Sequence, residues 1–173
     1  MVPKNLLKVY PHFVVSIALV ESGRPILGVL YNPVTKETFT AYKGIGARLN
    51  DELIKCSEKK HTKRMVILNS RSEINKGFWN NYQGQFAKFK AVGSVAYKLG
   101  LTAAGEGDVF ASLRPKNEWD ICAGNCIINE AGGKLIDLNC NQRVYNLYDT
   151  LIQPGFIAGG KEAVDQILAL LRP

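Results

Sequence analysis

The chain has 173 residues, of which 46% are hydrophobic and 21% are charged, values that exclude an intrinsically disordered protein and fit one domain or one core built from two subdomains. Its formal net charge of +7 favours an anionic partner, either a phosphorylated metabolite or a nucleic acid. The positive charges are scattered and form no zinc finger, RNP motif or helix-turn-helix, so we expect no nucleic-acid partner.

The first third of the chain has the pattern of antiparallel β-structure. Residues 1–5 give no signal for a helix or a strand. We predict strands at residues 13–20, 25–31 and 37–42, because these stretches are apolar or β-branched and turn sequences separate them. A glycine-containing loop at residues 43–47 and a polar connection at residues 51–64 follow. The pattern therefore predicts a three-stranded meander and then a linker.

From residue 65 onward, strands alternate with helices. Short apolar runs predict strands, and longer amphipathic stretches predict helices. The expected strands lie at residues 65–69, 86–92, 108–113, 134–138 and 154–158, and the expected helices at 72–82, 95–104, 119–131 and 161–171. This alternation is typical of an α/β protein with a mixed or largely parallel sheet covered by helices. We assign residues 1–64 to a β-rich subdomain and residues 65–173 to an α/β subdomain.

Two polar segments lie at expected helix N-termini, where free backbone N–H groups and the helix dipole favour anions. In the first, Gly93 permits a close backbone approach, and Ser94 either caps the helix or binds a phosphate or hydroxyl group. In the second, Asp120 lies in the first helical turn, where it either complements the dipole or binds a hard cation such as Mg²⁺. The residues alone leave both pairs of alternatives open.

Cysteine and histidine indicate no further site. Cys122 and Cys126 have no second pair at zinc-like spacing, so we expect packing thiols. His12 and His61 have no Ser or Cys partner at a motif spacing, so we expect them to be structural or solvated and expect no acyl-transfer catalysis. Without a secretory signal, a disulfide-like array or an apolar run long enough for a bilayer, the expected location is the cytoplasm, with no membrane partner.

Several ordered motifs resemble those of the inositol monophosphatase superfamily over nearly the whole chain. They are Trp119-Asp120 followed by small residues and then Glu130-Ala131-Gly132-Gly133, the segment that starts with Gly93-Ser94, and residues 28–33 and 43–50. The resemblance implies a layered α/β sandwich that hydrolyses a phosphate monoester with water activated between Mg²⁺ ions. It makes Asp120 a metal ligand and assigns no residue of this chain as the catalytic group.

The remaining metal ligands of the superfamily lie on a Glu-Glu pair and on an Asp-Pro-Leu/Ile-Asp-Gly-Thr motif. Both would precede the segment that starts near residue 4, and neither is in the sequence. One carboxylate cannot hold two Mg²⁺ ions, because each ion needs near-octahedral oxygen ligation. We therefore expect the N-terminal helices of the fold to be absent and this chain alone to have little or no turnover. A catalytically inactive remnant that binds anions or a partner protein is the alternative of another class.

Within the superfamily, the sequence looks most like the 3′(2′),5′-bisphosphate nucleotidase branch. In that branch, a Ser and a Lys one helical turn apart and an Arg upstream of Trp-Asp contact the phosphates. The resemblance implies substrate contacts by Ser94 and Lys98, which share a helix face, by Arg114, and by Gly93 and Arg71, although solvated side chains are the alternative. The expected substrate is 3′-phosphoadenosine 5′-phosphate, and the alternative is inositol phosphate or a sugar phosphate. A homodimer, common in the family, is possible.

Overall fold

Five antiparallel strands form the first sheet of the computed structural model, which describes residues 11–171. They are β1 (Val15–Glu21), β2 (Arg24–Asn32), β3 (Glu37–Tyr42), β4 (Gly46–Leu49) and β5 (Glu52–Ile54), and they lie in sequence order across the sheet. Side chains such as Leu30 and Phe39 point to the core face and are fully buried, whereas Val15, Ile17 and Leu19 of β1 are exposed on the opposite face. The period-2 pattern thus gives the sheet one buried face.

The sheet has two more strands than the three-stranded meander that the sequence predicted. Asn50 and Asp51 form the two-residue turn between β4 and β5, and both have positive φ angles of 46° and 71°. Asn and Asp tolerate this left-handed conformation, which a tight hairpin turn requires. In addition, Asn50 Oδ1 accepts the Thr38 N–H at 2.8 Å. The strand β5 has only three residues and lies within the polar stretch 51–64, which therefore has the composition of a linker.

The second sheet is mixed, as the sequence predicted, with the strand order β10-β12-β8-β6-β7. The strand β6 (Val66–Asn69) pairs in parallel with the edge strand β7 (Lys88–Ala91) and with the central strand β8 (Val109–Ser112). The strand β12 (Phe156–Gly160) pairs antiparallel with β8 and with β10 (Gly133–Asp137). A separate two-stranded ladder joins β9 (Lys116–Asn117) to β11 (Leu151–Ile152), and the sequence pattern did not predict it.

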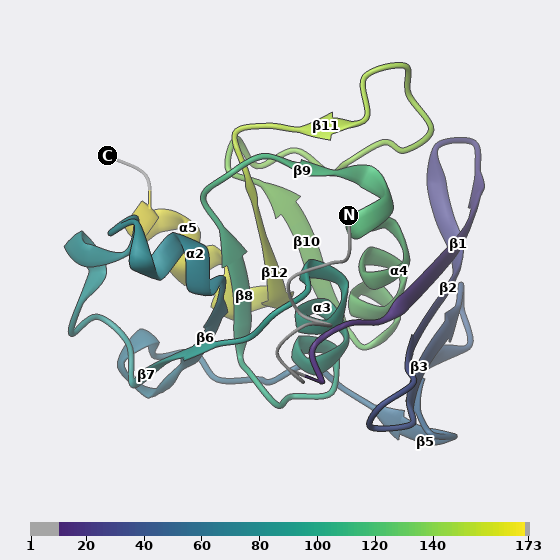
Figure 1. Cartoon of the computed structure of the whole chain (residues 1–173), viewed down its shortest axis with the longest axis horizontal. Coiled ribbons are helices and arrows are strands. Elements are labelled where there is room, and N and C mark those ends of the chain that lie inside the picture. The colour runs from purple at the N-terminus through teal and green to yellow at the C-terminus, as the bar shows by residue number, and fades with distance from the viewer. Residues whose placement is uncertain (1–10, 172–173) are drawn as a thin grey trace.

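Helices form a layer between the two sheets and a second layer outside the mixed sheet (Figure 1). The inner layer consists of α3 (Val95–Ala103) and α4 (Cys122–Glu130), and the outer layer of α2 (Arg71–Asn75) and α5 (Lys161–Leu171). Each layer has its own apolar cluster, one of which contains Phe39 and Leu99 and the other Ile67 and Ile167. The α/β layered sandwich predicted from the sequence is therefore confirmed. The division at residue 64 stays a prediction.

Two helices are shorter than predicted. The helix α2 ends at Asn75, because Gly77 turns the chain with a φ of 75°, and the rest of the predicted helix 72–82 contains only the 3-10 turn η2 (Asn80–Tyr82). The predicted helix 119–131 begins with the 3-10 turn η3 (Glu118–Asp120), and α4 starts only at Cys122. A further 3-10 turn, η1 (Thr62–Arg64), precedes β6.

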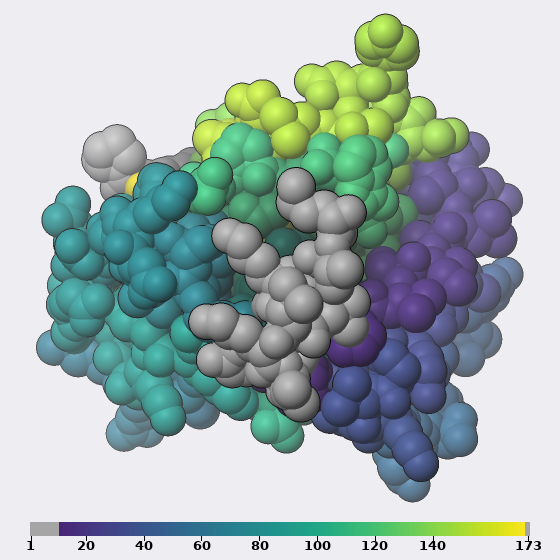
Figure 2. Space-filling model, viewed as in Figure 1, coloured from purple at the N-terminus to yellow at the C-terminus, as the bar shows by residue number. Residues whose placement is uncertain are grey.

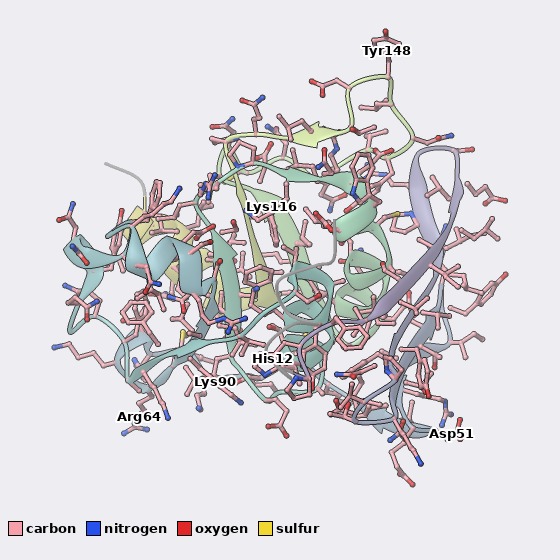
Figure 3. All side chains as sticks on the ribbon, in the orientation of Figure 1. His12, Asp51, Arg64, Lys90, Lys116 and Tyr148 are labelled. Carbon is pink, nitrogen blue, oxygen red and sulfur yellow. The ribbon has the colours of Figure 1, made fainter. Side chains whose placement is uncertain are left out.

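Three remaining features concern the ends and the surface. Residues 1–5, for which the sequence predicts neither helix nor strand, lie outside the described residues. Across residues 11–171, the helices are all too short or too polar to traverse a lipid bilayer. The loop of residues 139–150 projects from one end of the molecule, and the fully exposed Tyr148 lies at its tip (Figures 2 and 3).

Candidate functional site

The junction between β7 and α3 has a strained backbone. Ser94 is the N-cap of α3, and its Oγ accepts the Tyr97 N–H at 3.2 Å, so the capping alternative from the sequence is confirmed. The same residue has a φ of 55°, which a residue with a side chain rarely adopts. Strain of this kind costs about 1–3 kcal/mol and is concentrated at ligand sites. The junction is therefore a candidate site on geometric grounds.

Lys98 holds this junction from inside the protein. Its Nζ donates to the carbonyl oxygens of Ser94 at 2.8 Å and Val92 at 3.1 Å, and it lies 4.7 Å from the centroid of the Phe110 ring. The side chain is only 2% exposed, and this burial lowers the pKa of Lys98 to about 7, although the nearby carboxylates Glu73 and Asp120 act in the opposite direction. The Lys98 side chain is thus neither solvated nor directed outward.

Asp120 is brought to the same place by η3. The side chain is half-buried, and this burial raises the pKa of its carboxyl group, whereas the positive charges of Lys116 and Lys98 lower it. Lys98 donates to the Ser94 carbonyl oxygen, and its charge also acts on the Asp120 carboxylate. The Asp120 carboxylate and the start of α3 are therefore coupled through Lys98. We call this group the Asp120 site, defined by Gly93, Ser94, Lys98, Lys116 and Asp120.

Glu73 is a buried carboxylate that the sequence analysis did not select. It is 1% exposed and accepts hydrogen bonds from Ser112 Oγ at 2.7 Å, Trp79 Nε1 at 3.3 Å and the Leu113 N–H at 3.3 Å. Lys116 Nζ lies 3.6 Å from its Oε1. Glu73 therefore fixes α2 to the end of β8 and orients Lys116. Its sequence position, in a short helix, gives no sign of this burial.

Lys116 lies deeper in the site than Arg114, the neighbour that the sequence analysis selected. The Lys116 ammonium donates to the carbonyl oxygens of Arg114 and Pro115, both at 3.2 Å. Burial lowers the pKa of Lys116, and the charges of Glu73 and Asp120 act against this change. The Arg114 side chain itself is exposed. Lys116, which is labelled in Figure 3, therefore brings a positive charge that acts on the carboxylates of both Glu73 and Asp120.

The N–H of Gly93 is bound by a histidine that basic residues influence. His12 Nδ1 accepts this N–H at 3.2 Å. Burial, together with the positive charges of Arg71, Lys98 and Lys90, lowers the pKa of His12 below its ordinary value of 6.5. Hydrogen bonds join Lys98 to Ser94 and His12 to Gly93, and the charges of Arg71 and Asp120 act on Lys98. The exposed Arg114 is bound only through its carbonyl oxygen, and substrate binding by these residues stays a prediction. The region contains more positive than negative groups and suits an anionic ligand.

The described residues do not supply a complete metal site. Within residues 11–171, no three or more His, Cys, Asp or Glu side chains are grouped so that they could hold a metal ion. Mg²⁺ requires near-octahedral oxygen ligation, and only part of it can come from water. This part of the chain alone therefore does not fit the ion, and the role of Asp120 as a metal ligand stays a prediction.

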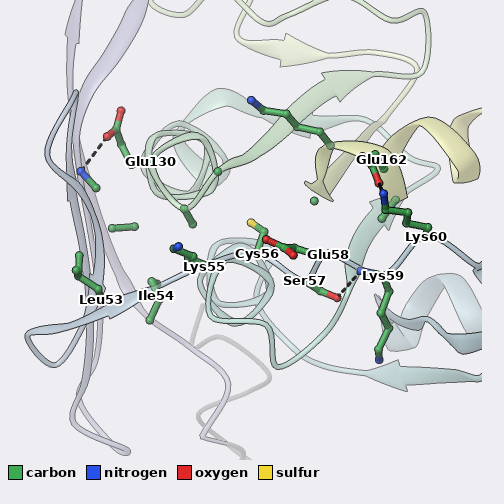
Figure 4. Close-up of a pocket in the computed structure, with 17 residues that line it drawn as sticks. Leu53, Ile54, Lys55, Cys56, Ser57, Glu58, Lys59, Lys60, Glu130 and Glu162 are labelled. Carbon is green, nitrogen blue, oxygen red and sulfur yellow. Dashed lines mark hydrogen bonds and ion pairs between the residues drawn. The ribbon is translucent and has the colours of Figure 1, made fainter.

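A pocket of about 630 Å³ lies apart from the Asp120 site (Figure 4). It is lined by residues 53–60, the end of α4 and the start of α5, and it shares none of its lining residues with the Asp120 site. Two of its lysines, Lys59 and Lys60, form ion pairs with Asp108 and Glu162, each at 3.0 Å. Because the charges of these two lysines are already paired, we do not select this pocket as the binding site for an anionic ligand.

Comparisons with known proteins agree with the fold and the motifs. The profile of the inositol monophosphatase family matches residues 4–172. Nus factor SuhB of Pasteurella multocida is 32% identical over 176 residues, which cover 98% of this chain and 63% of that protein. Inositol monophosphatase 2 of Saccharomyces cerevisiae is 34% identical over 160 residues, which cover 80% of this chain and 52% of that protein.

Solved structures give the same result. The extragenic suppressor protein SuhB of Bartonella henselae superposes with a TM-score of 0.83 at 29% identity, covering 98% of this chain and 68% of that one. The IMPase of Thermotoga maritima superposes with a TM-score of 0.82 at 30% identity, covering 96% of this chain and 63% of that one. The chain spans between 52% and 68% of the length of these four relatives.

Proposed function

Since this chain belongs to the inositol monophosphatase family, we propose that it acts in the metal-dependent hydrolysis of a phosphate monoester on a small metabolite, with Asp120 as a metal ligand. The family is one of phosphoric monoester hydrolases, and its members generally depend on metal ions. The observation that carries the proposal is the match of the family profile over residues 4–172, which include the Trp119-Asp120 motif directly before α4.

We assign Mg²⁺ as the ion, because a hard cation prefers carboxylate oxygen and would polarise the phosphoryl oxygens. The other ligands that the ion needs are not grouped within residues 11–171. The described residues instead attract and orient an anion: Lys116 and Arg71 supply positive charge, and the start of α3 supplies N–H groups. Binding of an anion without turnover is thus the second candidate function for this chain.

The substrate class that we propose is inositol phosphate or a sugar phosphate rather than 3′-phosphoadenosine 5′-phosphate. Two relatives are named inositol monophosphatases. In addition, the nucleotidase assignment expected Lys98 to contact a phosphate, whereas its ammonium already binds two backbone carbonyls. These observations favour the monophosphatase alternative from the sequence over its first choice. A homodimer stays a prediction.

Calorimetric titration of the 173-residue chain tests this proposal. Inositol 1-phosphate and 3′-phosphoadenosine 5′-phosphate would each be titrated with and without Mg²⁺, and phosphate release would be measured in the same samples. The phosphate oxygens of the ligand can supply coordination that residues 11–171 alone do not offer an ion, so we expect inositol 1-phosphate to bind more tightly with Mg²⁺. Asp120→Asn should weaken this binding by about tenfold or more, since a lost charged contact costs about 1.5–3 kcal/mol. Glu106→Ala, which removes an exposed carboxylate outside the Asp120 site, is the matched control.

Two outcomes would contradict the proposal. Binding that is insensitive to both Mg²⁺ and Asp120→Asn would remove the metal role of Asp120. Tighter Mg²⁺-dependent binding of the bisphosphate nucleotide would restore the nucleotidase assignment. Phosphate release separates the two candidate functions, because turnover supports hydrolysis and Mg²⁺-dependent binding without turnover supports an anion-binding role.

A further inference from the structure

His12 and Lys98 bind opposite sides of one peptide group. The peptide between Val92 and Gly93 directs its carbonyl oxygen to Lys98 Nζ at 3.1 Å and its N–H to His12 Nδ1 at 3.2 Å. Because a trans peptide is planar, its C=O and N–H point in opposite directions, so Lys98 on the inner side sets the direction of the Gly93 N–H on the outer side. His12 therefore occupies a donor that an anionic ligand at the start of α3 would use.

The groups that face His12 come from several elements. Arg71 of α2, Lys90 of β7 and Lys98 of α3 bring positive charge to it, and Figure 3 shows His12 and Lys90 in the same part of the molecule. The Tyr97 ring of α3 lies 6.0 Å from the imidazole ring, centroid to centroid. Its hydroxyl group donates to Glu37 of β3 at 2.6 Å, so this carboxylate is held at the phenol end of Tyr97.

These surroundings oppose a charged imidazole as long as the region holds no anion. A neutral imidazole can accept the Gly93 N–H, whereas an imidazolium has N–H groups on both nitrogens and cannot accept it. An anion near Arg71 and Lys90 would instead favour the imidazolium form of His12, because an opposite charge within about 4–6 Å favours the charged form of a side chain. The imidazolium would then donate to the anion, and the Gly93 N–H would become available to the same ligand.

We propose that His12 is a proton-coupled anion contact, which releases the Gly93 N–H and takes up one proton from solvent when an anionic group binds in front of α3. This inference rests on the proposed function, because it uses the same anion-binding region, and it adds a residue that sequence reasoning treated as structural or solvated. No bond between non-hydrogen atoms changes. One proton moves from solvent to Nδ1 of His12, and the hydrogen bond from the Gly93 N–H is exchanged for one to the ligand.

The chain offers a direct test, because His12 and His61 are its only two histidines. The ring proton of each histidine would be followed by NMR as a function of pH, with and without sulfate. Sulfate stays doubly charged over the whole range, so its own protonation does not contribute. The exposed His61 is the internal reference, and His61→Gln assigns the two signals. The backbone amide signals of Gly93 and Ser94 report whether sulfate binds there.

We expect sulfate to raise the pKa of His12 by about one unit or more, the size of shift that a nearby opposite charge causes, and to leave His61 unchanged. In His12→Gln, whose neutral amide does not take up a proton, calorimetry in buffers of different ionisation enthalpy should lose the uptake of the proton.

The outcomes distinguish this inference from the proposed function. If the Gly93 and Ser94 amide signals respond to sulfate while the His12 signal keeps its titration curve, the inference is wrong and the anion-binding region stands. If neither the amide signals nor the histidine signals respond to sulfate, both the inference and the proposed anion-binding region are wrong. An equal shift of His61 would show a general ionic-strength effect and would overturn the inference as well.

Discussion

Removal of the Glu73 carboxylate is the perturbation whose size the structure determines best. Glu73→Ala deletes an acceptor of three hydrogen bonds, which come from the side chains of Ser112 and Trp79 and from the Leu113 N–H, and it leaves Lys116 without its partner at 3.6 Å. Loss of one partner of a buried ion pair costs about 3–5 kcal/mol. Because the Lys116 side chain is 18% exposed and can regain some water, we expect a cost of about 3 kcal/mol.

Urea unfolding followed by tryptophan fluorescence measures this cost. Trp79 is 1% exposed and bonded to Glu73, whereas Trp119 is 60% exposed, so the change in emission on unfolding reports mainly on Trp79. Glu73→Gln keeps an acceptor oxygen and should cost about half as much as Glu73→Ala. In the double variant Glu73→Ala, Lys116→Met, no unpaired charge is left, and the loss should be smaller than in Glu73→Ala alone.

The exposed Glu106→Ala variant is the control and should stay within about 0.5 kcal/mol of the wild type. A free energy of unfolding for Glu73→Ala within about 1 kcal/mol of the wild type, with unchanged Trp79 emission, would refute the reasoning. It would show that the carboxylate does not hold α2 to β8 and that Lys116 is oriented by other contacts.

Two further predictions concern the start of α3. Burial lowers the pKa of Lys98 in the folded protein to about 7 from its ordinary value of 10.5, so the unfolded chain binds more protons above that pH. The free energy of unfolding should therefore rise with pH between about 7 and 8.5, by up to about 1.4 kcal/mol per pH unit, and urea titrations of Lys98→Met should show a smaller rise. An equal slope in both proteins would contradict the burial of the charge. Ser94→Ala keeps the strained φ of 55° but loses the cap, and should cost about 1 kcal/mol, whereas Ser94→Gly relieves the strain and should cost less. Thermal unfolding compares the two variants, and greater stability of the alanine variant would be the opposite of this expectation.

The sequence predicted the elements whose hydrophobic period is long enough to recognise. Strands β1 to β3, the later alternation of strands with helices, and α5 all have such periods. The strands β4 and β5 were missed, because they have only four and three residues and their hairpin depends on the positive φ angles of Asn50 and Asp51. The helix α2 was predicted too long, because the turn at Gly77 interrupts a sequence that otherwise favours a helix.

The candidate site could be predicted only where local sequence determines it. Ser94 and Asp120 precede helices, a position at which polar residues have recognisable chemistry. Glu73 and Lys98 were different. Each is a charged residue on a short helix, and each is buried because partners distant in sequence, Ser112 for one and Phe110 for the other, enclose it. From the sequence, Glu73 was not selected, and Lys98 was expected to contact a phosphate, with a solvated side chain as the alternative; neither expectation included burial.

The most direct measurement of the central claim uses Mn²⁺ as a paramagnetic probe of the Mg²⁺ site. Amide signals of the isotopically labelled chain would be recorded as Mn²⁺ is added in the presence of inositol 1-phosphate, whose phosphate oxygens can supply ligands that residues 11–171 alone lack, for the wild type and for Asp120→Asn. If Asp120 and the start of α3 form one site, the amide signals of residues 118–122 and of residues 93–95 broaden together in the wild type, and both effects are lost in the variant. Broadening that centres elsewhere, or that persists unchanged in Asp120→Asn, would contradict the account.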